Sequence, residues 1–331
     1  MKKVIDSLFT ELEIHPVLMD VGALERPPEI WDTIARHSIY VGLSPEAKLL
    51  PSRYRDAFYQ VCLVDSVVTT TAKSGQVPLY LTKDPVYSSL LEPKQANSTG
   101  FLDWAAILER ELMVPGTTVN ALMGRLALTR IDWLHTNVNG VDLRLYQSIE
   151  DRLRRRILAL DTVLDLVDFW VEQGSPLAAY QGILDDGFWL SRLEPYGFVK
   201  MRPESLERIR KVDHRLDGRV LANRHRRTPG WIFARFFRTI DSLTAGEFSP
   251  RDCASLWAFA LLDGQVGFAA DVAFEYERIF GADHSFQAML NETVNRMREL
   301  TPGTSFRSIA RKYVPKVVRR GLRRLLPRDA E

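Results

Sequence analysis

The sequence predicts an α/β fold in which helices cover both faces of a mostly parallel sheet, followed by a smaller helical region. Short apolar runs that end in turn residues alternate with helical stretches through about the first 200 of the 331 residues. Such runs are typical of buried parallel strands joined by helices. Beyond about residue 225 the apolar spacing becomes helical. A chain of this length can bury a large core without disulfides or metals.

The expected strands are short runs rich in apolar and β-branched residues. Residues 15–22 (HPVLMDVG) end in Asp-Val-Gly, as expected for a buried strand that leads into a turn. Pro27 and Pro28 suit the first turn of a helix that runs to Ala35. Ligands of such sheets bind outside the carboxyl ends of the strands, so we expect the site there. The other expected strands lie within 38–43, 61–71, 77–82, 131–138, 156–166 and 188–193.

A polar break at residues 224–230 (RHRRTPG) separates two regions. We expect a sheet domain over residues 1–225 and a helical region over 226–331. Four aromatic residues just after the break have near-helical spacing, so we expect them in the core of the helical region. They are Trp231, Phe233, Phe236 and Phe237. Helices are also expected over 177–186, 254–262, 266–280 and 289–300.

Composition indicates a cytoplasmic protein. No apolar run approaches the roughly 18 residues that a membrane-spanning helix needs. Asp6, Glu11 and Glu13 interrupt the N-terminal segment, so no signal peptide is expected. The two cysteines, Cys62 and Cys253, form neither a metal motif nor a disulfide framework, which suits a reducing compartment.

Several common site motifs have no counterpart in the sequence. Neither G-x-x-x-x-G-K nor G-x-G-x-x-G follows the first strand, which disfavours a dinucleotide-dependent dehydrogenase. There is no zinc-ligand spacing and no G-x-S-x-G elbow, so we expect neither a metal centre nor a serine hydrolase.

Five segments in a fixed order carry a family resemblance. They are VLMDVGA (17–23), YVGLSPE (40–46), LYLTKDPVYSSLLEP (79–93), IDWLHTNVNGVDL (131–143) and DDGFWLSRL (185–193). Over about residues 15–200 the chain resembles the FkbM-type methyltransferases, most distinctively at Ser88 and Ser89. The resemblance implies a Rossmann-like class I fold and the cofactor S-adenosylmethionine. It also implies O-methylation of a sugar, a glycolipid or another secondary metabolite.

The resemblance places the cofactor site at the ends of the first two strands. Asp20, Gly22 and Ala23 match the turn that carries the methionine end of the cofactor, and Asp20 is the candidate partner of its ammonium group. Ser44 stands where the family has a ribose-binding acid, and Glu46 lies two residues further on. The family's second loop glycine is absent.

The expected catalytic residues follow the strand within 131–138. His135, Asn137 and Asn139 stand where the family carries lysine, aspartate and glutamine. His135 is the candidate general base because histidine titrates near neutrality, and a structural histidine at a strand end is the alternative. Asn137 is a candidate hydrogen-bond donor to substrate or cofactor, or a turn residue. Asp142 is a candidate base or metal ligand, or the N-cap of the next helix.

The C-terminal segment 311–328 predicts an amphipathic basic helix. Beyond Pro315, the residues Val318, Leu322 and Leu325 follow helical i, i+4, i+7 spacing. Such a helix suits an anionic membrane surface, and docking on an acidic protein face is the alternative. Nucleic acid is not an expected partner, because the rest of the chain lacks a basic surface signal. The basic residues are Arg311, Lys312, Lys316, Arg319, Arg320, Arg323, Arg324 and Arg328.

Three functional hypotheses follow. The first is a cytoplasmic O-methyltransferase that modifies a glycan or glycolipid precursor near the inner membrane surface, in polysaccharide biosynthesis. The second is a methyltransferase-like fold kept as a binding or scaffold module in an assembly, because several family positions differ. The third is an enzyme that handles nucleotide sugars. An oligomer is compatible with each.

Overall fold

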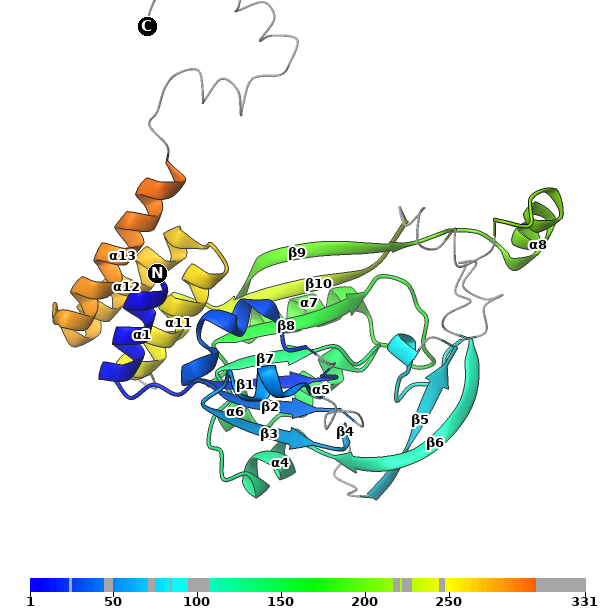
Figure 1. Ribbon diagram of the computed structural model, residues 1–331, viewed down its shortest axis with the longest axis horizontal. Helices are drawn as coiled ribbons and strands as arrows, with labels where there is room; N and C mark the ends of the chain where they lie inside the picture. Colours follow the sequence, from blue (N-terminus) through cyan, green and yellow to red (C-terminus); the bar gives the residue numbers. More distant parts are fainter. Residues whose placement is uncertain are drawn as a thin grey trace, which may run out of the picture.

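The computed structural model describes residues 1–23, 26–44, 50–70, 75–83, 85–94, 107–216, 221, 228–243 and 248–301. The described chain contains a central sheet with helices on its faces, a smaller second sheet, and a bundle of helices at one end of the molecule (Figure 1). Within these ranges no helix is both long and apolar enough to cross a membrane. The tail 311–328 lies outside the described residues.

Seven strands form the central sheet, and most come from the apolar runs noted above. They are β1 (Val17–Val21), β2 (Ile39–Leu43), β3 (Gln60–Val64), β7 (Trp133–Thr136), β8 (Ala159–Asp165), β9 (Phe188–Phe198) and β10 (Thr228–Arg238). Their order is β3-β2-β1-β7-β8-β10-β9. The first five strands in this order are parallel to one another, and β10 is antiparallel to β8 and β9. The expected α/β fold with a mostly parallel sheet is confirmed.

Strand β10 corrects the expected helical core after the polar break. Phe236 packs in the core on one face of the sheet and Phe237 in the core on the other. A strand buried on both faces has no alternation of polar and apolar residues. Its four aromatic residues therefore also fit a helical spacing, which made the prediction wrong. The sheet runs to Arg238, beyond the boundary expected at residue 225.

Helices cover both faces of the sheet, as expected. One core contains Leu18 and Trp133 of the sheet, and the other contains Met19 and Leu134. The first core is covered by α1 (Lys2–Glu11), η1 (Glu29–Thr33), η2 (Ala35–His37), α2 (Ser52–Arg55), α10 (Ile240–Leu243), α11 (Pro250–Leu262), α12 (Val266–Phe280) and α13 (His284–Leu300). The second is covered by α4 (Val119–Arg125), α5 (Asp142–Ser148), α6 (Asp151–Arg154) and α7 (Pro176–Asp185).

The helices expected near the C-terminus are confirmed as α11, α12 and α13. A capping box fixes the first turn of α11: the side chains of Ser249 and Asp252 each accept a hydrogen bond from the other residue's backbone amide. The guanidinium of Arg251 then holds the buried carboxylate of Asp132 at 2.7 and 2.9 Å, which ties α11 to the residue before β7. The helix expected at 27–35 is present only as the short 3-10 turns η1 and η2.

A second sheet stands beside the carboxyl ends of the central strands (Figure 1). It contains β4 (Val67–Val68), β5 (Gly75–Thr82) and β6 (Leu108–Thr117) in the order β4-β6-β5. The short helix η4 (Pro85–Tyr87) follows β5. Tyr87 meets Trp231 of β10 edge-on, with ring centroids 6.3 Å apart. The segment with the paired serines therefore reaches the central sheet.

Candidate active site

The order in which the chain adds strands to the sheet reverses between β1 and β7. After β1 the chain passes to the face that carries η1, and after β7 it passes to the opposite face with α5. This switch point is where open α/β sheets bind ligands. Gly22 has φ of +84°, and a Cβ there would lie 2.2 Å from the carbonyl oxygen of Asn137. The two loops therefore pack so closely that the position requires glycine.

Asp20 and His135 face each other on β1 and β7. Nδ1 of His135 lies 2.9 Å from Oδ1 of Asp20, and the hydroxyl of Tyr40 donates to Oδ2 at 2.8 Å. A carboxylate can only accept hydrogen bonds, so Nδ1 carries the proton. Asp20 is 2% exposed. Both of its oxygens are thus occupied inside the protein.

The environment of His135 favours the charged imidazolium. Burial lowers its pKa, but the hydrogen bond and charge of Asp20, with smaller effects of Asp161 and Asp142, raise the pKa above its ordinary value. Trp31 meets the imidazole edge-on, with ring centroids 6.2 Å apart. Among the described residues Nε2 makes no hydrogen bond, and 18% of the side chain is exposed. A histidine held at Nδ1 by a carboxylate, with Nε2 free, has the geometry of a proton acceptor.

A buried ion-pair network continues from this dyad across the sheet. Asp161 lies opposite His135 on β8. Two nitrogens of Arg235 hold Asp161 at 2.7 and 2.9 Å, and the third holds Asp263 at 2.7 Å. Arg235 is shared by two carboxylates, so it neutralises the negative charge of Asp161 only in part. Asp161 therefore still attracts positive charge on His135.

A cleft opens on the α5 face, beside the ends of β7 and β8. Asp142 begins α5 and Asp165 ends β8. The lining also includes Leu143, Arg144, Val163, Leu164, Gln173 and Ser175. The cleft therefore combines an apolar wall with two carboxyl groups.

The two carboxyl groups of this cleft are hard to ionise. Asp142 is 2% exposed; Oδ1 accepts from the amide of Val138 at 3.3 Å, and Oδ2 has no hydrogen-bond partner in the described chain. Burial raises the pKa of Asp142 to about 6. Burial and the charge of Asp142 raise the pKa of Asp165 to about 7. Such perturbed groups in a cleft are typical of functional sites.

Asp142 does not cap the helix that it begins. The N-cap of α5 is Val141, which has no side-chain cap, and Asp142 bonds the amide of Val138 instead. The capping alternative is therefore wrong. Among the described residues no group of three or more His, Cys, Asp and Glu side chains suits a metal ion.

Asn139 and Gly140 shape the loop after β7. Nδ2 of Asn139 donates to the carbonyl of Ser88 at 2.9 Å, and the hydroxyl of Ser89 donates to the carbonyl of Asn139 at 2.6 Å. A Cβ on Gly140, where φ is +88°, would lie 2.4 Å from the ring of Trp170. The paired serines thus hold the loop that carries Asn137 to Asp142.

The remaining expected cofactor residues lie at the ends of β1 and β2. The amides of Gly22 and Ala23 both donate to the carbonyl of Leu43, at 3.0 and 3.1 Å. Ser44 is half-buried, and its amide donates to the carbonyl of Val64 at 3.2 Å. Glu46 lies outside the described residues.

Two residues of the candidate site were not expected from the sequence. Tyr40 precedes Gly42, and a Cβ on Gly42 would lie 2.8 Å from the Tyr40 ring, so this glycine makes room for the tyrosine. Asp165 closes an expected strand, and the strand-end rule that selected Asp20 also fits it.

The chain matches no protein-family model, no curated protein and no solved structure. The family resemblance therefore rests on the five sequence segments quoted above.

Proposed function

We propose that this chain is a cytoplasmic S-adenosylmethionine-dependent O-methyltransferase that acts on a hydroxyl of a sugar, a glycolipid or another secondary metabolite. The observation that carries the proposal is the sheet. Numbered along the chain, its strands follow the order 3-2-1-4-5-7-6. The first five positions are those of doubly wound nucleotide-binding sheets. The seventh strand, β10, is antiparallel and lies between the fifth, β8, and the sixth, β9. This is the arrangement of class I methyltransferases.

The cofactor, which supplies an electrophilic methyl group, fits this site in part. The backbone at Gly22 borders the switch point, and the half-buried Ser44 at the end of β2 suits a ribose hydroxyl. Asp20 does not fit the role of an ammonium ligand, because Tyr40 and His135 occupy its oxygens. In this proposal Asp20 instead orients His135, the proton acceptor.

Neutral His135, protonated on Nδ1 alone, takes the proton of the acceptor hydroxyl on Nε2. Because the pKa of His135 is raised, this neutral form becomes more populated as the pH rises. Asp20 holds the ring in the required tautomer and stabilises the imidazolium that forms, and Tyr40 fixes Asp20. A general base placed in this way contributes about 10²- to 10⁴-fold to the rate.

The cleft beside α5 receives the acceptor. Asp142 and Asp165 accept hydrogen bonds from sugar hydroxyls, while Leu143 and Val163 contact the ring faces. In this proposal the acceptor extends from the cleft over the carboxyl end of β7 to Nε2 of His135, whose side chain contacts Trp31 on the η1 face of the sheet.

Calorimetric titration of the purified chain with S-adenosylmethionine and S-adenosylhomocysteine tests the proposal. We expect micromolar binding of both. His135→Ala should keep this binding and lose transfer of a labelled methyl group to a panel of glycans. The matched control is His284→Ala, because this side chain is 78% exposed and its charged neighbour is Glu11 of α1. Absence of heat and of thermal stabilisation with either ligand would overturn the proposal.

One observation favours a non-catalytic binding or scaffold module as the second candidate. Both oxygens of Asp20 and the amides of Gly22 and Ala23 already have partners within the protein. If this is the function, neither ligand binds, and stable Asp20→Ala and His135→Ala variants keep full biological activity.

A further inference from the structure

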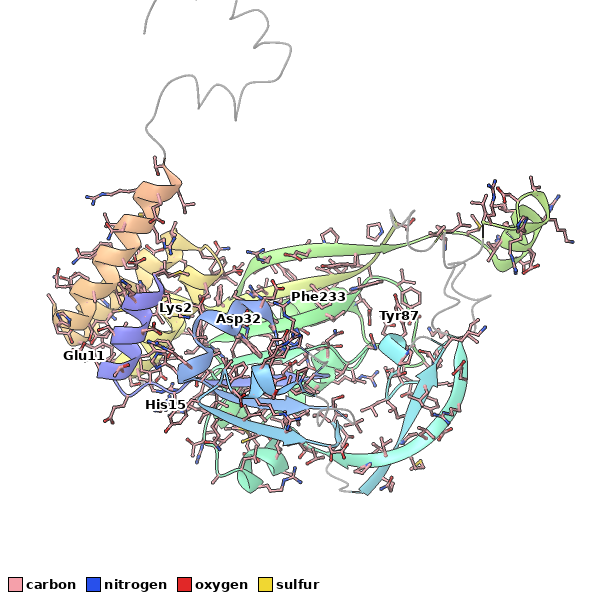
Figure 2. The ribbon with its side chains drawn as sticks, viewed as in Figure 1. Lys2, Glu11, His15, Asp32, Tyr87 and Phe233 are labelled. Atoms are coloured by element: carbon pink, nitrogen blue, oxygen red, sulfur yellow. The ribbon has the colours of Figure 1, made fainter. Side chains whose placement is uncertain are left out.

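Helix α8 (Pro203–Val212) lies beyond the tip of the β9–β10 hairpin, away from both sheets and from the helical bundle (Figure 1). The hairpin carries it there because β9 and β10 stay paired to Phe198 and Thr228, past the end of β8. The side chains of this segment project into open space (Figure 2). The described chain therefore leaves most of α8 uncovered.

One side of α8 is apolar. Leu206, Ile209 and Val212 recur at three-residue spacing, which places them along one side of the helix. Leu206 and Ile209 are half-buried, and Val212 is 89% exposed. An apolar side chain this exposed at the end of a projecting element indicates a contact that the described chain does not supply.

The same segment is basic. Residues 200–216 contain six Lys and Arg and three Asp and Glu, for a net charge of +3. Glu207 and Asp213 are paired with Arg210 and Arg215, at 3.4 and 2.7 Å. Arg208 and Lys211 form no ion pair within the described chain. The sequence continues to residue 227 with four arginines and one aspartate, so residues 200–227 carry +6, whereas the whole chain carries +2.

We propose that α8 and its flanks, residues 200–216, dock on an anionic lipid bilayer. A helix with an apolar side and basic flanks lies in the bilayer interface, with its apolar residues below the headgroups and its cations beside anionic lipids. Nucleic acid would account for the cations but not for the exposed apolar side. An acidic protein would account for both only if it also carried a matching apolar groove, whereas an anionic bilayer supplies both features on any face. The position of α8 at the tip of a hairpin lets it reach a surface without obstruction by the body. The proposal does not depend on the methyltransferase function.

Co-sedimentation of the full chain with vesicles tests the proposal. Vesicles of phosphatidylcholine alone are compared with vesicles that contain phosphatidylglycerol as well. We expect binding only to the second kind. Arg208→Glu/Lys211→Glu and, separately, Val212→Asp should each weaken it, the double variant by about tenfold or more.

Two control variants make the result specific. Arg125→Glu/Arg152→Glu makes the same charge change at exposed positions elsewhere, and Arg319→Glu/Arg320→Glu makes it in the basic tail. Both should retain more binding than the α8 variants, and all variants should keep the wild-type circular dichroism spectrum. Equal losses in α8 and control variants would overturn the proposal. So would vesicle binding that Val212→Asp leaves intact, or binding of RNA in place of anionic vesicles.

Discussion

Asp20 and His135 lie 115 residues apart in the chain, yet Nδ1 of His135 donates a 2.9 Å hydrogen bond to Oδ1 of Asp20. The bond follows from topology, because β1 and β7 are adjacent and the two residues are in register. The carboxylate that the family resemblance assigns to the cofactor therefore orients the histidine. With Tyr40 on the other oxygen, the three side chains form one unit.

Replacing Asp20 with asparagine should lower the pKa of His135. The carboxylate raises this pKa against the effect of burial, and asparagine removes its charge while nearly keeping its shape. Titration of the imidazole by NMR measures the shift. An unchanged pKa of His135 would contradict the pairing.

The stabilisation from this pair should depend on pH. The folded-state pKa of His135 is raised, so the contribution is fully present below the unfolded value of about 6.5 and is lost as pH rises through the folded value. The free energy of unfolding of wild type should exceed that of His135→Gln most at about pH 5–6. Urea unfolding at several pH values measures the difference, and a difference that grows toward pH 9 would refute the prediction.

Much of the fold could be predicted from local patterns. The runs that became β1, β2 and β7 are buried on both faces, and a short apolar run with a turn behind it has few alternatives. Strand β6 was not expected, because its residues are mostly exposed and its glutamates and arginine hide the alternation. Helix α1 was not expected either, although Ile5, Leu8 and Phe9 form its buried face.

The candidate site could be predicted only in part. The strand-end rule found Asp20 and His135 separately, since it depends on each strand alone. Their hydrogen bond depends on which strands are neighbours, and no local pattern contains that information. The family resemblance even assigned them to different tasks. Tyr40 required the same knowledge of strand order, whereas the strand-end rule, applied to the strand within 156–166, could have found Asp165.

Replacing Asp142 with asparagine should stabilise the protein above neutral pH. Burial raises the pKa of Asp142 from 3.8 to about 6, so the cost of its charge is absent below about pH 3.8 and complete above about pH 6. That difference corresponds to at most about 3 kcal/mol. At pH 8 we expect Asp142→Asn to unfold at a higher urea concentration than wild type, and this advantage should vanish near pH 4. Asp271→Asn, at an exposed position, is the control and should show no such dependence. A loss of stability at pH 8 would contradict the prediction.

Replacing Gly22 with alanine should force the loops after β1 and β7 apart. The new Cβ would lie 2.2 Å from the carbonyl oxygen of Asn137, at a φ of +84° that alanine rarely adopts. Strain of this kind costs about 1–3 kcal/mol of unfolding free energy. Gly124→Ala is the matched control: its Cβ would meet no atom within 4 Å, and it lies within α4. There the same substitution should stabilise the protein by about 0.5–1 kcal/mol. Denaturant unfolding measures the free energy of unfolding of both variants. Tight packing at the switch point should lower it for Gly22→Ala while Gly124→Ala raises it. A change in the same direction in both variants would indicate a general effect of replacing glycine and would contradict the prediction.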